Sequence, residues 1–261
     1  MNWIEALILG IIQGLTEFLP VSSSGHLELG KHILGIEYSE SLTYTVVVHG
    51  ATVLSTIIVF WKTILELVRD LFKFQWNDST RYIVKIFVSM IPVLIVGLFF
   101  KEQVESLFTG DILFVGLMLL VTSALLAFTY YAKEKQKEMS YKNAFVIGIA
   151  QACAVIPGIS RSGATIATGL YMGIKKEKVA RFSFLMVLVP IIGANVKDLI
   201  DFNFSAQNTV SITPLIVGFI AAFISGLLAC SWMLKIVKRG KLIYFAVYCF
   251  IVGAIAILFS F

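Results

Sequence analysis

The chain has 261 residues, of which 58% are hydrophobic and 14% are charged, and its formal net charge is +5. A soluble domain of this length usually carries about 25% charged residues, because it needs a polar surface around its core. The composition therefore excludes an ordinary soluble domain and predicts a protein that lies in a lipid bilayer. We expect a single membrane domain over residues 1–261 and no nucleic acid among its partners.

Apolar segments long enough to cross a bilayer recur along the whole chain. A helix needs about 20 predominantly apolar residues to span the hydrocarbon core. Six segments read as full spans: 42–62, 82–101, 111–132, 178–200, 211–236 and 241–261. The expected fold class is therefore an all-α polytopic membrane protein with six transmembrane helices.

Two further apolar segments, 2–33 and 141–172, are interrupted in the middle. The interruptions at 19–25 and 156–163 are clusters of Pro, Gly and Ser. Such clusters end a helix because Pro lacks an N–H group and Gly costs backbone entropy. Each segment has the length of two half-membrane helices and a turn. We expect two re-entrant helical hairpins, each of which enters and leaves on the same side of the membrane.

The basic residues predict how these segments are oriented. The loops 62–81, 132–142, 172–181 and 235–241 hold four Lys or Arg residues each, which is sixteen of the 21 in the chain. Cytoplasmic loops carry an excess of Lys and Arg, so we place these four loops in the cytoplasm. Both termini then lie outside the cytoplasm. The first hairpin enters from the outside and the second from the inside.

The two hairpins also resemble each other in sequence. Residues 13–25 read QGLTEFLPVSSSG and residues 151–163 read QACAVIPGISRSG, so one Gln, two Ser and one Gly coincide without a gap. Three predicted spans follow each hairpin. An inverted-topology repeat is predicted, with repeat one at about 1–132 and repeat two at about 140–261. Such repeats bring their broken helices together near the membrane midplane.

Two ionisable residues, Glu17 and Arg161, lie within or beside these interruptions. A charge inside the membrane costs about 2.5–3.5 kcal/mol on insertion scales, so it needs a partner or a wet cavity. A guanidinium group can bind phosphate through two parallel hydrogen bonds. One alternative is an ion pair that only locks the two tips together. We favour a phosphate site, because the hydroxyl groups nearby suit phosphate.

Those hydroxyl groups come from both interruptions. They are Ser22, Ser23, Ser24, Ser160, Ser162 and Thr165. Some of them are expected to cap helices, since Ser and Thr are common N-caps. Each interruption also begins a second half-helix, whose free N–H groups and positive dipole end attract anions. Together with Arg161, the two tips predict a pocket that binds a polyanion.

A histidine and a possible cation site complete the candidate chemistry. His26 follows the first glycine and can serve as base, acid or nucleophile near neutral pH, although a lone histidine can also be a packing residue. His32 and His49 have no motif around them and are expected to be structural. Because a carboxylate repels phosphate, Glu17 is protonated, acts as a base, or binds a divalent cation. That cation would be Mg²⁺ or Ca²⁺, with Gln13 as the candidate second ligand.

These motifs resemble those of a known family. Gln13 and Glu17, together with the run FLPVSSSGH at 18–26, resemble the first signature of bacterial undecaprenyl-pyrophosphate phosphatases of the bacitracin-resistance type. The run PGISRSGAT at 157–165 resembles their second signature, and the likeness extends along the whole chain. The resemblance implies removal of one phosphate from the C55 polyprenyl pyrophosphate, which regenerates the carrier lipid for cell-wall polymers. It also implies a location in the bacterial cytoplasmic membrane, with an active site reached from the extracytoplasmic side.

The resemblance also assigns roles to individual residues. They are Glu17, Ser23, His26, Ser160, Arg161 and Thr165. Many members of the family have Glu where this chain has Gln13, so this chain lacks a second carboxylate at the site. Ser23 is our first choice of nucleophile, with His26 as its base. Direct attack by His26 and a water molecule activated by Glu17 are the alternatives.

A second class of function also fits the predicted architecture. Inverted repeats with broken helices that meet at the midplane are typical of transporters. The chain could then be a transporter or flippase for the polyprenyl phosphate lipid. The sequence does not specify the oligomeric state, and a homo-oligomer is compatible with it.

Overall fold

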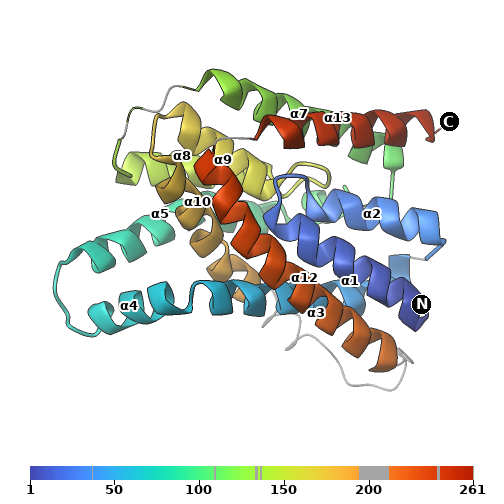
Figure 1. Cartoon of the computed structure of the whole chain (residues 1–261), viewed down its shortest axis with the longest axis horizontal. Helices are drawn as coiled ribbons and strands as arrows, with labels where there is room; N and C mark the ends of the chain where they lie inside the picture. The colour runs from blue at the N-terminus through green and yellow to red at the C-terminus, as the bar shows by residue number, and fades with distance from the viewer. Residues whose placement is uncertain are drawn as a thin grey trace.

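A computed structural model of the chain shows a bundle of helices (Figure 1). The structure describes residues 1–36, 38–108, 110–132, 135, 137–193, 212–239 and 242–260. Across these ranges the regular secondary structure is helical, apart from one isolated β-bridge between Lys137 and Ile174. The all-α class predicted from the sequence is therefore confirmed.

The two interrupted segments each form a pair of short helices. The first pair is α1 (Trp3–Phe18) and α2 (Ser23–Leu34), and the second is α8 (Tyr141–Cys153) and α9 (Arg161–Tyr171). The breaks between the helices, at 19–22 and 154–160, end three residues earlier than predicted. Ser22 and Ser160 are N-caps, so the serines that follow each of them already belong to the first turn of the second helix.

Five further helices of 16 residues or more accompany these pairs. They are α3 (Tyr38–Val59), α5 (Asp78–Phe99), α7 (Ile112–Phe128), α12 (Ile212–Arg239) and α13 (Ile243–Leu258). Judged by length and apolar composition alone, three described segments could each cross a membrane: Asp78–Phe99, Ile112–Tyr131 and Ile212–Val237. A fourth span is possible if Thr43–Val59 is counted with α4 (Trp61–Leu71), to which it is bent by 76°. The described chain is thus a multi-pass membrane protein, and α13 is an additional, shorter apolar helix.

The predicted span at 178–200 is interrupted within its described part. Helix α10 (Lys176–Met186) ends before Val187, and residues 188–193 are helical again. Pro190 explains this break, because its ring nitrogen cannot donate to the carbonyl of Met186 and its ring crowds that carbonyl. Residues 194–200 of the predicted span lie outside the described residues. The remaining short elements are α6 (Lys101–Glu105) and a 3-10 turn at Thr129–Tyr131.

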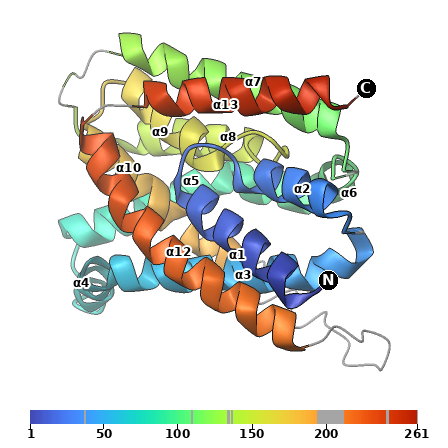
Figure 2. The same ribbon diagram turned by 45° about the vertical axis from the view of Figure 1, so that its right-hand side comes forward.

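The helices of the first half pack reciprocally against those of the second half. Helices α1 and α3 both pack on α12, while α8 and α10 both pack on α5. Helices α7 and α13 pack on each other and lie side by side across the top of Figures 1 and 2. The two termini lie at the same end of the molecule, opposite the connection between α4 and α5.

Glycines allow two of these helix pairs to approach closely. A Cβ atom at Gly10 of α1 would lie 2.6 Å from the carbonyl oxygen of Gly218 in α12. A Cβ atom at Gly148 of α8 would lie 2.2 Å from the carbonyl oxygen of Ser89 in α5. Gly10 and Gly148 occupy the same position in the gapless alignment of the two hairpins. Small residues at such contacts are typical of helix packing in membranes.

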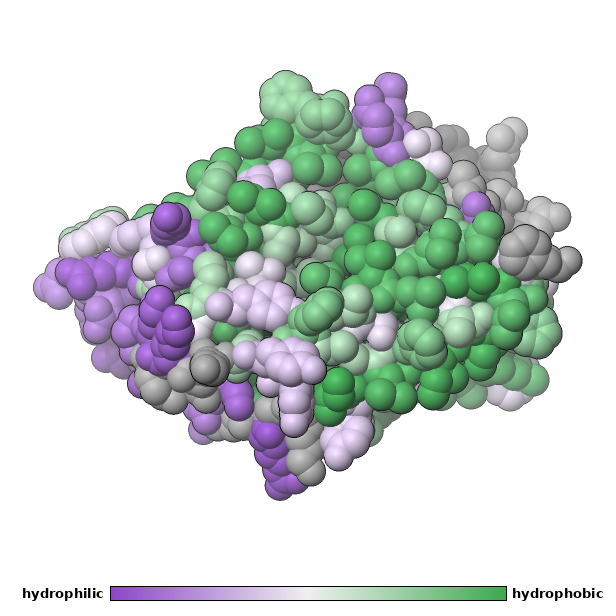
Figure 3. All heavy atoms as spheres, turned by 90° about the horizontal axis from the view of Figure 1, so that it is seen from above, coloured by the Kyte–Doolittle hydropathy of each residue, from purple (hydrophilic) through white to green (hydrophobic). Residues whose placement is uncertain are grey.

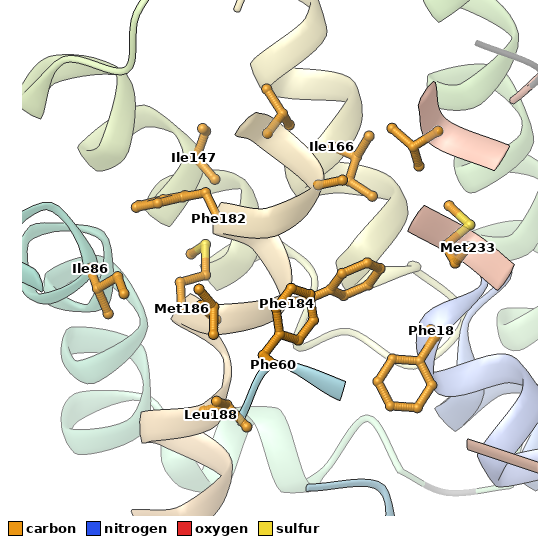
Figure 4. Close-up of a cluster of buried hydrophobic side chains, with 14 of the residues drawn as sticks. Phe18, Phe60, Ile86, Ile147, Ile166, Phe182, Phe184, Met186, Leu188 and Met233 are labelled. Carbon is orange, nitrogen blue, oxygen red and sulfur yellow. The ribbon is translucent and has the colours of Figure 1, made fainter. Parts of the chain in front are cut away.

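A cluster of aromatic side chains holds the end of α1 against α10. Phe184 of α10 lies 5.9 Å from Phe18 and 6.2 Å from Phe60, measured between ring centroids (Figure 4). Aromatic pairs at this separation contribute about 0.5–1.5 kcal/mol beyond the area that they bury. Phe18 directly follows Glu17, so this cluster fixes the backbone that carries the first candidate site residue.

The outer surface is strongly apolar. Large hydrophobic side chains such as Leu258, Phe99 and Leu228 are 74%, 73% and 67% exposed. Hydrophobic residues cover most of the face drawn in Figure 3, and hydrophilic residues gather at its left-hand end. Exposed apolar patches of this extent mark contact with an apolar environment, which for helices of this length and composition is lipid.

Candidate active site

The two helix starts at α2 and α9 are built alike. Ser22 and Ser160 each accept a hydrogen bond from the backbone N–H three residues later, at 3.2 and 3.0 Å. Each of these hydroxyl oxygens also lies 3.3 Å from the hydroxyl oxygen two residues further on, in Ser24 and Ser162. Residues that coincide in the sequence alignment of the hairpins therefore make the same contacts. Their backbones differ, because Ser22 has a φ of 71° and Ser160 a φ of −70°.

Neighbouring groups hold the second tip in place. The backbone N–H of Ser160 donates to the hydroxyl of Thr122 at 2.9 Å, and that hydroxyl donates to the carbonyl of Gly158 at 3.0 Å. The hydroxyl of Ser162 donates to the carbonyl of Leu19 at 3.2 Å, which joins the second tip to the first. The two interruptions are therefore in direct contact.

Glu17 is the centre of the polar contacts between the hairpins. Arg161 Nη2 donates to Glu17 Oε1 at 2.5 Å, and Ser23 Oγ donates to Glu17 Oε2 at 2.7 Å. Gln13 Nε2 donates to the same Oε2 at 2.9 Å. Glu17 is 7% exposed, so its charge is stabilised by these donors and little by solvent. Four of the predicted site residues thus meet at one carboxylate.

A cavity of about 840 Å³ opens beside this carboxylate. The predicted site residues on its wall are Glu17, Ser22, Ser23, Ser24, Ser160, Arg161 and Ser162. Apolar side chains of α5 and α6 and of residues 187–193 form another part of the wall, including Met90, Leu94, Leu98 and Val104. A cavity lined both by hydroxyl and charged groups and by apolar groups suits an amphiphile with an anionic head.

Two predicted site residues point elsewhere. Thr165 Oγ1 donates to the carbonyl of Arg161 at 2.8 Å and lies 2.6 Å from the hydroxyl oxygen of Ser183. His26 Nδ1 lies 2.8 Å from the carbonyl oxygen of Ser22, and its Nε2 lies 2.9 Å from the hydroxyl oxygen of Tyr248. Neither residue is among the described residues that line the cavity. In this arrangement each residue bonds to a backbone carbonyl at the start of its own helix, His26 to that of Ser22 and Thr165 to that of Arg161.

Some cavity residues were not predicted as site residues. His49 was expected to be structural, yet it lines the cavity, with its Nδ1 held 2.8 Å from the carbonyl oxygen of Thr45. The sequence could not reveal this, because the apolar helix α3 gives no indication of which face turns inward. Gln151 also lines the cavity. Gln151 aligns with Gln13 in the two hairpins, and this match could have predicted that Gln151 belongs to the site.

The oxygen atoms near Glu17 allow only a limited cation site. No group of three or more His, Cys, Asp or Glu residues that could hold a metal ion occurs in the described part of the chain. Both oxygens of Glu17 already accept hydrogen bonds. Gln13 Oε1 is buried and has no hydrogen-bond partner among the described residues. The residues fit a site in which a substrate supplies most of the ligands, as Mg²⁺ often requires.

Comparison with known proteins identifies the family. Residues 6–255 match the family described as Bacitracin resistance protein BacA. The chain belongs to the BacA family. Both signature runs, at 13–26 and 157–165, lie within the matched residues.

Named relatives of this BacA chain are similar over their full length. A protein named undecaprenyl-diphosphatase from Bacteroides fragilis is 58% identical over 263 residues, which is 100% of this chain and 99% of the relative. One of the same name from Parabacteroides distasonis is 58% identical over 260 residues, 98% of each chain. A third, from Methanosphaera stadtmanae, is 40% identical and covers 100% of this chain and 99% of its own. The family resemblance predicted from the two signatures is confirmed.

Proposed function

We propose that this protein is a membrane hydrolase that converts undecaprenyl pyrophosphate into undecaprenyl phosphate and inorganic phosphate. The contact between Arg161 and Glu17 carries the proposal, because it brings a guanidinium group into a cavity lined by serine hydroxyls from two hairpins. The relatives named undecaprenyl-diphosphatase support the same activity. The product would be the carrier lipid that cell-wall synthesis uses again.

The cavity matches both parts of this substrate. The pyrophosphate would lie against the N-terminal ends of α2 and α9, where free backbone N–H groups and the helix dipoles favour negative charge. Arg161 would bind it through Nη1, which has no hydrogen-bond partner among the described residues. The first isoprene units would extend along the apolar side of the wall formed by α5 and α6. In this proposal Ser22, Ser24, Ser160 and Ser162 bind the phosphates.

Ser23 is the proposed nucleophile, and Glu17 is its base. The hydroxyl of Ser23 already donates to Glu17 at 2.7 Å, which is the geometry that general-base catalysis requires. Ser23 Oγ attacks the terminal phosphorus, the bond to the bridging oxygen breaks, and the proton passes through Glu17 to the departing undecaprenyl phosphate. A water molecule then attacks phosphoserine, and its proton returns to Ser23 through Glu17 as phosphate leaves. Positioning and charge neutralisation supply most of the rate in such transfers.

His26 has a different role in this proposal. The sequence suggested that His26 is the base for Ser23, but its ring nitrogens bond to the Ser22 carbonyl and to Tyr248. We assign His26 to positioning, because its bond to the Ser22 carbonyl fixes the tip on which the serines lie. Thr165 has a comparable role in the second tip, through its bond to the Arg161 carbonyl.

A divalent cation, Mg²⁺ or Ca²⁺, is part of the proposal. Gln13 Oε1 and Glu17 are the groups of the chain that would hold it, and phosphate oxygens would complete its ligands. When bound, the cation would neutralise charge on the pyrophosphate.

The membrane topology that we propose has six spans and two re-entrant hairpins in an inverted-topology repeat, with repeat one at about 1–132 and repeat two at about 140–261. The reciprocal packing of α1 and α3 on α12 and of α8 and α10 on α5 supports it. The basic loops would face the cytoplasm of a bacterial cell, and both termini and the cavity would face the opposite side. A homo-oligomer is compatible with this arrangement.

Phosphate release from the purified protein tests the activity against the transporter alternative. Wild-type protein in detergent, with Mg²⁺ or Ca²⁺ and undecaprenyl pyrophosphate, should release phosphate continuously. The same preparation in liposomes should be assayed for movement of undecaprenyl phosphate between leaflets. Lipid movement without any phosphate release in the presence of either cation would contradict the hydrolase activity and show that the protein is a flippase.

A further inference from the structure

Gln151 carries an unusual set of unsatisfied polar atoms. Its side chain is 3% exposed, and neither Nε2 nor Oε1 has a hydrogen-bond partner among the described residues. A buried polar group without a partner costs about 1–3 kcal/mol. Native structures contain few such groups, and each one calls for a reason. Because Gln151 lines the cavity, a ligand could supply the missing partners.

The equivalent residue in the first hairpin shows what such a partner would be. Gln13 donates from Nε2 to the carboxylate of Glu17, four residues later, at 2.9 Å. The residue four positions after Gln151 is Val155, which has no acceptor and also lines the cavity. The second hairpin therefore has the amide donor of the first hairpin without its anionic acceptor. An anion from outside the chain would complete the pattern.

A second donor is left free on the same hairpin. Arg161 uses Nη2 for Glu17, while its Nη1 is buried and has no hydrogen-bond partner among the described residues. Gln151 lies in the last turn of α8 and Arg161 begins α9, so the two donors lie on either side of the second interruption. The hydroxyls of Ser160 and Ser162 line the same cavity. Free donors on both sides of this turn favour an anion that several groups bind together.

We propose that Gln151 Nε2 donates a hydrogen bond to a phosphate oxygen of the bound pyrophosphate. This phosphate oxygen would accept from Gln151 in the second hairpin as the Glu17 carboxylate accepts from Gln13 in the first. This inference rests on the proposed function, because it assigns a further substrate-binding residue to the same site. It also explains why an amide suits this position, since a carboxylate there would repel the phosphate.

Substitution of Gln151 by Met tests the inference. Met has a similar volume and removes both polar atoms, so the folded protein should keep or raise its thermal midpoint in detergent. Loss of one hydrogen bond to a charged group should weaken binding about tenfold to a hundredfold. The measurements are the dissociation constant for inorganic pyrophosphate by calorimetry and the KM for undecaprenyl pyrophosphate. Gln75→Met, at an exposed position away from the cavity, is the matched control.

Gln151→Glu is the second variant, because a carboxylate at this position should weaken pyrophosphate binding more than Met does. If Met prevents extraction of folded protein, Gln151→Leu supplies the same measurement. Pyrophosphate affinity and KM within twofold of wild type in the folded Met or Leu variant would overturn the inference. Wild type that binds no pyrophosphate would overturn it as well. A wild type that binds pyrophosphate but hydrolyses no lipid would contradict the proposed function instead.

Discussion

At the scale of single residues, Glu17 receives hydrogen bonds from Gln13 one helical turn earlier, from Ser23 across the first break and from Arg161 of the second hairpin. The meeting of Glu17 with Arg161 could be predicted, because both are charges in apolar sequence and each needs a partner. The hydrogen-bond partner of Ser23 could not be predicted from the sequence. Ser23 and His26 lie three residues apart on one helix and could face each other, and only side-chain rotamers decide that Ser23 turns to Glu17. Sequence does not specify those rotamers.

A covalent intermediate distinguishes the three candidate nucleophiles. Rapid quenching of wild type with labelled substrate should trap phosphate on Ser23, because the hydroxyl of Ser23 is already bonded to a base. Ser23→Ala should show no trapped phosphate and no turnover. Mass spectrometry of the quenched protein locates the label. Phosphohistidine at position 26, or turnover by a folded Ser23→Ala variant, would contradict the assignment.

At the scale of elements, the two broken helices were predictable and one break was missed. Clusters of Pro, Gly and Ser indicated both interruptions, but the capping by Ser22 and Ser160 ends each of them three residues earlier than predicted. The interruption after α10 was overlooked, although Pro190 stands within the predicted span. The apolar run continues through this interruption. Hydropathy indicates that a segment is long and apolar enough to span a membrane, but it does not indicate whether the helix is continuous.

Close helix packing gives a prediction for stability. Gly148→Ala should destabilise the protein by about 1–3 kcal/mol, because the new methyl group would meet backbone atoms of Ser89, which cannot rotate away. Gly50→Ala is the matched control within helix α3, since nothing lies within 4 Å of its added Cβ atom. The control should be neutral or stabilise the protein by up to about 1 kcal/mol, through higher helix propensity.

Thermal unfolding in one detergent compares the two alanine variants directly. The midpoint of Gly148→Ala should fall below that of wild type, and the midpoint of Gly50→Ala should not. Equal midpoints for the two variants would mean that α8 can move away from α5 without loss of stability. The reciprocal packing would then contribute little to the fold.

At the scale of the whole molecule, one sequence feature predicted that the two tips correspond to each other. The matching runs at 13–25 and 151–163 indicated equivalent tips, and the tips do make matching contacts. The sequence could not predict the cavity wall, because much of its apolar part comes from α5, α6 and residues 187–193. Helix α5 and residues 187–193 have ordinary apolar composition, and α6 reads KEQVE with a single apolar residue. Their role depends on tertiary packing alone.

Thiol labelling tests the proposed topology. In a variant without native cysteines, Asn2→Cys should react with a membrane-impermeant maleimide added to intact spheroplasts, because the N-terminus is proposed to lie outside. Gln75→Cys, in the basic loop 62–81, should react only after the membrane is opened. Labelling of position 75 in intact spheroplasts, with position 2 protected, would invert the proposed topology and place the cavity on the cytoplasmic side.

Turnover in variants of the buried pair tests the central claim that Glu17 and Arg161 form a catalytic site. Glu17→Ala and Arg161→Ala should each lower phosphate release from undecaprenyl pyrophosphate by at least about a hundredfold, the usual effect of removing one group that stabilises transition-state charge. Arg81→Ala, at an exposed surface ion pair 3.8 Å long, is the control and should match wild type. We expect these losses in protein that is still extracted as a folded species. Phosphate release within twofold of wild type in either folded variant would contradict it, and the ion pair would then serve only to join the two hairpins.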